Sequence, residues 1–138
     1  MGDDAAGLHI VRELSNDLQS LSTNHLIIET GPAPENFTGQ IRRFGPDVVL
    51  LIDAAQMGLA PGSIRLLSAH EAVGWGGSTH TLPLSTLSKF IAFEIGCEVY
   101  ILGIQVKSIE PGSAMSEEVQ EAVDSVINGL NASLLSRT

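Results

Sequence analysis

The feature that most constrains the fold is a run of five consecutive apolar residues, VVLLI, at positions 48–52. A strand that is apolar at every position is covered on both faces, which is typical of a parallel sheet between helices. We therefore interpret this run as a central, buried strand. Asp53 follows it directly. In open α/β sheets, ligands bind in the crevice beyond the carboxyl ends of the strands, so Asp53 is a candidate site residue.

The remaining elements follow from hydrophobic periodicity. Helical spacing predicts helices over residues 6–21, 84–95 and 119–134 and a shorter helix over 36–44. Short apolar or alternating runs predict strands at 26–28, 63–67 and 98–102. The strand at 63–67 is expected at a sheet edge. Strands that alternate with helices predict an α/β fold. We expect a three-layer, doubly wound and mainly parallel sheet of four to five strands, with helices on both faces. The 138 residues are interpreted as one domain.

Composition narrows the possible partners and the cellular compartment. The net charge is −9, with seven basic residues against sixteen acidic ones, which argues against nucleic acid and anionic membranes as partners. No apolar stretch reaches the roughly 20 residues of a membrane-spanning helix, and no secretory signal is recognisable at Met1. Cys97 is the only cysteine, which suits a reducing, cytoplasmic setting. We expect it to be packed rather than reactive, and the oligomeric state stays open.

Two further polar residues could join Asp53. Asp3 and Asp4 precede the first predicted helix, and either could cap it, while Asp4 could instead act as a ligand. His80 lies after a glycine-rich stretch and could be an exposed loop histidine or part of a site. Trp75, the sole tryptophan, could be a hydrophobic plug or an aromatic flap over the crevice.

Two carboxylates and one imidazole would form a partial metal shell with open positions. By ligand type, Asp4, Asp53 and His80 suit nickel or zinc, and ligand type does not choose between these metals. The sequence contains no H-E-x-x-H zinc helix, no G-x-S-x-G nucleophile elbow and no phosphate-binding P-loop.

Five separated motifs, in order along the chain, resemble the [NiFe]-hydrogenase maturation endopeptidases. The motifs are MGDDAAG at 1–7, GPAPEN at 31–36, IDAAQMGLAPG at 52–62, THTLPL at 79–84 and LGIQ at 102–105. The resemblance is closest to the type that processes the large subunit of formate-hydrogenlyase, a hydrogenase-3-like enzyme. It covers nearly the whole chain.

This resemblance implies an activity and a set of site residues. These peptidases remove a C-terminal extension from the hydrogenase large-subunit precursor after nickel insertion, and nickel in the precursor's cysteine site is the recognition signal. The family's three metal-contacting positions, which also serve catalysis, correspond to Asp4, Asp53 and His80. Glu29 stands where the family usually has Asp and, like Trp75, is a candidate substrate contact. A capping or surface role for Glu29 is the alternative. Nickel, carried by the precursor, is the expected metal.

The chain departs from the family pattern in three places. The N-terminal strand that normally precedes the G-D-D segment is missing, so we expect an N-terminally shortened domain whose sheet lacks a central strand. A wrongly assigned start would explain this difference. Ala5 replaces a glycine, and Pro32 replaces a small polar residue.

Two rival functions come from other classes. A non-catalytic module could bind the precursor and sense nickel without cutting, and binding without proteolysis would distinguish it. A flavodoxin-like small-ligand domain is less well supported, because no phosphate-binding loop rich in Gly, Ser or Thr follows any predicted strand. Stabilisation by phosphate would reveal it.

Overall fold

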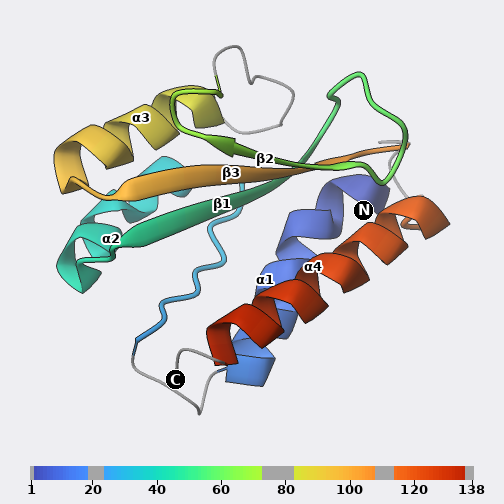
Figure 1. The fold of residues 1–138 in the computed structure, drawn as a ribbon, viewed down its shortest axis with the longest axis horizontal. Helices are drawn as coiled ribbons and strands as arrows, with labels where there is room; N and C mark the ends of the chain where they lie inside the picture. The colour runs from blue at the N-terminus through green and yellow to red at the C-terminus, as the bar shows by residue number, and fades with distance from the viewer. Residues whose placement is uncertain (1, 19–23, 73–82, 108–113, 136–138) are drawn as a thin grey trace.

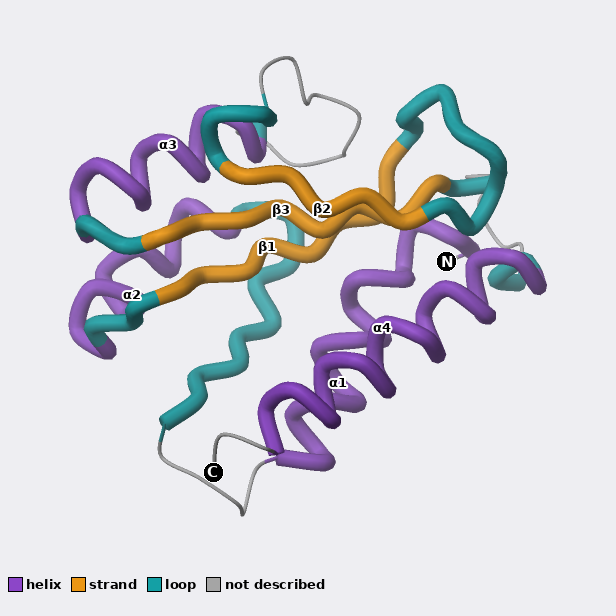
Figure 2. The backbone as a smooth tube through the Cα atoms, viewed as in Figure 1, coloured by secondary structure: helices purple, strands orange, loops and turns teal. Residues whose placement is uncertain are grey.

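The computed structural model describes residues 2–18, 24–72, 83–107 and 114–135 (Figures 1 and 2). Within these ranges three strands form one sheet in the order β1-β3-β2: β1 (Val48–Ala55), β2 (Ile64–Ser68) and β3 (Glu98–Gln105). β3 pairs in parallel with β1 and antiparallel with β2. The α/β prediction is confirmed in this mixed form, whereas a mainly parallel sheet of four to five strands is not.

Two strand predictions need correction. The run at 48–52 is not central, because β1 lies at one side of the described sheet and β3 occupies the middle. Nor is it fully buried, because Val48 is exposed and residues 49–52 are only partly buried. Residues 26–28 are not a strand, because residues 25–30 join no ladder in the described part of the chain. The prediction of an edge strand at 63–67 is confirmed by β2. A strand requires a hydrogen-bonded neighbour, and apolar composition alone does not supply one.

Each predicted helix has a counterpart, although residues 19–21 of the first prediction lie outside the described residues. They are α1 (Ala6–Leu18), α2 (Thr38–Phe44), α3 (Leu84–Ile95) and α4 (Glu117–Leu135), with 3₁₀ turns η1 (Gly2–Ala5) and η2 (Pro34–Phe37) before the first two. Pro34 opens η2, where its missing N–H costs no hydrogen bond. Across the described ranges, no helix is both long and apolar enough to cross a bilayer.

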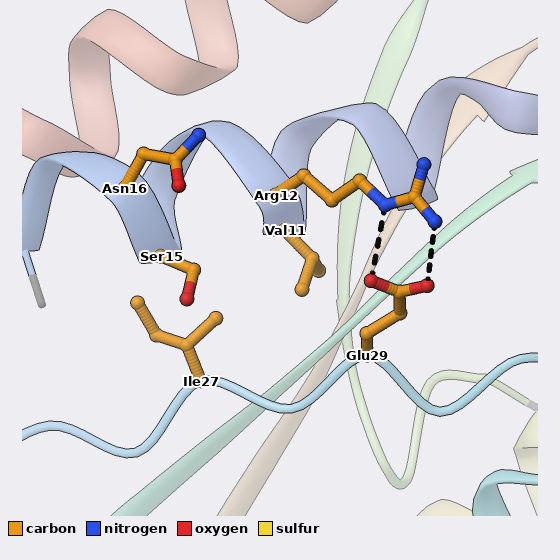
Figure 3. A pocket seen from close by; sticks show the side chains of 6 residues that line it. All are labelled: Val11, Arg12, Ser15, Asn16, Ile27 and Glu29. Carbon is orange, nitrogen blue, oxygen red and sulfur yellow. Dashed lines mark hydrogen bonds and ion pairs between the residues drawn. The ribbon is translucent and has the colours of Figure 1, made fainter.

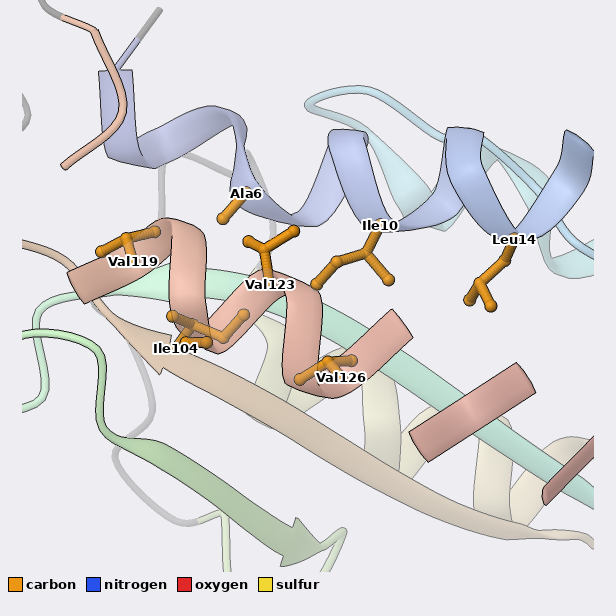
Figure 4. Packing of buried hydrophobic residues seen from close by; sticks show 8 residues of the cluster. Ala6, Ile10, Leu14, Ile104, Val119, Val123 and Val126 are labelled. Atoms are coloured by element: carbon orange, nitrogen blue, oxygen red, sulfur yellow. The ribbon is translucent and has the colours of Figure 1, made fainter. Parts of the chain in front are cut away.

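One hydrophobic cluster, which we call the α1–α4 cluster, joins these two helices to the sheet. Ala6, Ile10 and Leu14 recur every fourth residue, so their side chains share one face of α1. They pack against Ile104 of β3 and against buried valines of α4: Val119, Val123 and Val126 (Figure 4). Figure 1 shows the two helices side by side beneath the sheet.

A second hydrophobic cluster, the α2–α3 cluster, lies on the opposite face of the sheet. Side chains alternate along a strand, so Val99 and Ile101 point away from the face that carries Ile104. They pack with Leu87 and Ile91 of α3, and Ile41 of α2 lies against the same cluster. The sheet therefore has apolar cover on both sides, and its strand ends remain available for polar residues.

Candidate functional site

Asp4 lies on a short turn that leads into α1. The turn η1 packs against β1, the strand that carries Asp53. Asp4 is exposed, whereas its neighbour Asp3 is only 1% exposed. The turn therefore presents one carboxylate to solvent and buries the other.

Asp53 occupies the third position from the end of β1, because the strand continues to Ala55. It lies opposite Gly103 of β3 and is 6% exposed. The glycine at position 7 allows α1 to approach this part of β1. A Cβ added there would lie 3.1 Å from the carbonyl oxygen of Ile52 and 3.9 Å from the Cα of Asp53. The first turn of α1 thus touches the backbone beside Asp53, three residues after Asp4.

The buried carboxylate of Asp3 links the N-terminal turn to two distant segments. The backbone N–H groups of Lys107 and Ser116 each donate to it at 2.7 Å, and the Ser116 hydroxyl donates at 3.0 Å. Lys107 follows the end of β3 and Ser116 directly precedes α4. Asp3 therefore joins η1, β3 and α4 at one point.

An exposed ion pair lies beside this junction. Lys107 Nζ is 2.8 Å from Glu118 Oε2. Hydrogen bonding to Glu118 raises the pKa of Lys107, and the negative charges of Glu118 and Asp3 add to this effect. The same hydrogen bond lowers the pKa of Glu118. Lys107 consequently stays cationic next to the buried Asp3 carboxylate.

Gln105, the last residue of β3, holds the loop that follows β1. Its side-chain oxygen accepts hydrogen bonds from the N–H groups of Met57 and Leu59, at 2.7 and 3.2 Å. Its amide nitrogen donates to Gln56 Oε1 and to the Val106 carbonyl, both at 2.8 Å. The side chain is 2% exposed, so these bonds replace those it would make to water.

Glu29 pairs with Arg12 on the outer side of α1 (Figure 3). The two guanidinium–carboxylate hydrogen bonds measure 3.0 and 2.9 Å. Hydrogen bonding to Arg12 holds the pKa of Glu29 below its ordinary value. Both residues line a shallow depression of about 300 Å³, together with Val11, Ser15, Asn16 and Ile27. The geometry places Glu29 in an ion pair, and a contact with substrate stays a prediction.

The structure brings together the elements that carry two of the three predicted ligands. η1 with Asp4 contacts β1 with Asp53, while His80 lies outside the described residues, as does Trp75. Within the described part of the chain no three His, Cys, Asp or Glu side chains are arranged to hold a metal ion. The joint binding of one ion by Asp4, Asp53 and His80 therefore stays a prediction.

Sequence reasoning missed the roles of Asp3 and Gln105. The local sequence predicts only a helix cap for Asp3, and Gln105 is only the last residue of the LGIQ motif. A polar residue at the end of a mostly apolar strand is the one local signal for Gln105. For Asp3, no local signal exists, because its partners lie 104 and 113 residues further along the chain.

Comparison with known sequences gives a match over most of the chain. Residues 8–132 match the family model described as hydrogenase maturation protease. A putative hydrogenase maturation protease of Methanocaldococcus jannaschii is 34% identical over 134 residues, spanning 94% of this chain and 79% of that protein. The hydrogenase 3 maturation protease of Escherichia coli is 34% identical over 131 residues, covering 94% of this chain and 81% of its own length.

Solved structures agree with the sequence comparison. The crystal structure of the [NiFe] hydrogenase maturation protease HycI from Thermococcus kodakarensis superimposes with a TM-score of 0.84 at 29% identity, covering 98% of this chain and 85% of that one. The solution structure of the endopeptidase HycI from Escherichia coli superimposes with a TM-score of 0.78 at 32% identity. The match covers 96% of this chain and 83% of that one. By sequence and by fold, this chain belongs to the hydrogenase maturation protease family.

Proposed function

We propose that this chain is an endopeptidase that removes the C-terminal extension of a nickel-loaded [NiFe]-hydrogenase large-subunit precursor. Family membership supports the class of reaction and of substrate. The observation that carries the site assignment is the contact between the Asp4-bearing turn and the Asp53-bearing strand, with Gly7 against the backbone beside Asp53. Asp4 and Asp53, which are distant in the sequence, therefore lie on elements that contact each other.

Nickel enters this proposal as part of the substrate. Asp4, Asp53 and His80 would meet the nickel ion that the precursor holds in its cysteine site. Imidazole nitrogen is a suitable ligand for nickel, and carboxylate oxygens can complete a mixed shell. The exposed Asp4 is accessible to an incoming precursor, whereas the buried Asp53 is held within a strand. Nickel would then serve as the recognition element, either anchoring the substrate or also polarising the scissile carbonyl.

Hydrolysis also requires a group that accepts a proton from water. A carboxylate of the site can act as this general base. The water oxygen adds to the scissile carbonyl carbon while its proton moves to the carboxylate. The carbon–nitrogen bond then breaks, and the proton passes to the leaving amine. Asp4 and Asp53 are the candidates for this role, and the charge of the other carboxylate would remain available for the metal.

The decisive test is cleavage of the nickel-loaded precursor, followed by the mass loss of the large subunit. Asp53→Asn and His80→Ala should each abolish release of the C-terminal peptide. Asp124→Asn and His70→Ala are matched controls, because both residues are exposed and neither belongs to the proposed site. The controls should cleave at the wild-type rate. Undiminished cleavage by both site variants would refute the assigned roles.

Two further experiments distinguish this proposal from cleavage that does not depend on nickel and from binding without cleavage. Nickel-free precursor should remain uncut, and equal cleavage with and without nickel would refute nickel recognition. If the wild-type chain binds the loaded precursor without cutting it, the chain is a non-catalytic sensing module instead.

Glu29 and Trp75 are proposed as secondary substrate contacts. Truncating either side chain should weaken precursor binding more than it slows the cleavage step.

A further inference from the structure

We propose that Asp3 is a positioning residue that sets the place of Asp4 and thereby the rate of precursor cleavage. This inference rests on the proposed function, because it concerns the same site. It assigns different roles to the two adjacent aspartates. Asp4 meets the substrate, and Asp3 fixes the turn that carries Asp4 to the rest of the fold.

The hydrogen bonds of Asp3 carry this assignment. Three donors from two other segments reach one carboxylate at 2.7, 2.7 and 3.0 Å. Hydrogen bonds to an ionised carboxylate are shorter and stronger than neutral ones. With 1% exposure, Asp3 has almost no contact with water that could replace them. Because Lys107 and Ser116 already donate to its oxygens, Asp3 is poorly suited to bind a metal itself.

The place of these bonds explains why they should affect catalysis. η1 is a four-residue 3₁₀ turn, and such a short turn has few hydrogen bonds of its own. Asp3 fastens this turn to Lys107 after β3 and to Ser116 before α4. Asp4 is the next residue along the chain. A catalytic side chain misplaced by about 1 Å can cost roughly 100-fold in rate, so loosening Asp3 should slow cleavage without removing Asp4.

A graded set of variants tests the proposal. Asp3→Asn keeps the side-chain shape but turns an NH₂ group toward N–H donors, while Ser116→Ala removes only the hydroxyl donor. We expect kcat/KM for the nickel-loaded precursor to fall roughly 10–100-fold in Asp3→Asn and about 3–10-fold in Ser116→Ala, mainly through kcat. Asp124→Asn on the exposed side of α4 is the matched control and should leave kcat/KM unchanged.

Rates are compared per folded molecule, at a temperature below the unfolding transition of every variant. Amide NMR spectra supply a second readout, in which Asp3→Asn should shift the signals of Lys107, Ser116 and Asp4. If Asp3→Asn lowers only the melting temperature and keeps wild-type kcat/KM, the positioning role is wrong. If Asp3→Asn does not fold, Ser116→Ala decides, and wild-type kcat/KM in that variant overturns the proposal. Failure of the wild-type chain to cleave would instead overturn the proposed function, and the positioning role with it.

Discussion

Asp3 and Asp4 have the same side chain and adjacent positions, yet their surroundings differ completely. Asp3 is buried and accepts three hydrogen bonds, while Asp4 is exposed. From the sequence, both were candidates to cap the first helix, and only the resemblance to the family distinguished them. The difference arises from segments more than a hundred residues away, which local sequence patterns do not contain.

The Arg12–Glu29 ion pair gives a prediction about pH. Because hydrogen bonding to Arg12 lowers the pKa of Glu29 in the folded protein, the pair stabilises the fold above the pKa of an unfolded glutamate. This contribution is lost as the pH falls through the lower, folded-state value. In Arg12→Gln, the carboxyl NMR signal of Glu29 should titrate at a higher pH than in the wild type.

Glu71 is the internal control for this titration. Its pKa is lowered by hydrogen bonds from Ser68, and Arg12 does not contribute. Its titration should therefore be the same in the wild type and in Arg12→Gln. An unchanged titration of Glu29 would contradict the ion pair, and the pair is exposed enough that its effect on overall stability should be small.

At the scale of elements, most predictions that depended on a local signal succeeded, and the strand predicted at 26–28 is the exception. The apolar spacing at Ala6, Ile10 and Leu14 predicted α1, and continuous apolar runs predicted β1 and β3. The order of the strands failed, because strand pairing joins residues far apart in the sequence. Val48 pairs with Glu98, and no periodicity within either strand encodes that partner or makes β3 central.

The loop between β1 and β2 also depends on a distant contact. Gly58 and Gly62 both have positive φ angles, of 71° and 83°. No atom lies within 4 Å of a Cβ added at Gly58, but a Cβ at Gly62 would lie 2.5 Å from the backbone oxygen of Glu118 in α4. The two glycines thus share a backbone conformation and differ in packing.

Alanine substitutions should separate these two effects. Gly58→Ala should cost about 1–2 kcal/mol, the penalty of the left-handed conformation alone. Gly62→Ala should cost roughly 1–3 kcal/mol more, because the methyl group must push α4 away. Urea unfolding of both variants measures the difference. Equal losses of stability would show that the loop does not pack on α4 as described.

For the whole molecule, the sheet connects two hydrophobic clusters on its opposite faces. Ile10 belongs to the α1–α4 cluster and Ile91 to the α2–α3 cluster, and both are fully buried. Because β3 contributes side chains to both clusters, we expect the two faces to unfold together.

Removing one methyl group from each cluster tests this cooperativity. Ile10→Val and Ile91→Val should each cost about 0.5–1.5 kcal/mol, and the double variant should lose their sum, because the two side chains belong to different clusters on opposite faces of the sheet. Phe93→Ala is the surface control, since this side chain is 84% exposed and should change stability by less than about 0.5 kcal/mol. Two separate unfolding transitions would contradict a single cooperative unit.

The proposed function depends most on whether Asp4, Asp53 and His80 jointly reach the nickel ion of the precursor. Nickel X-ray absorption tests this directly, using a nickel-loaded precursor whose cleavage site has been altered to block hydrolysis. Addition of the wild-type chain should add oxygen and nitrogen neighbours to the nickel, including the scattering pattern of an imidazole, and His80→Ala should remove that imidazole pattern alone. A nickel spectrum that is the same with and without a stably bound chain would contradict direct binding of the nickel ion by these residues.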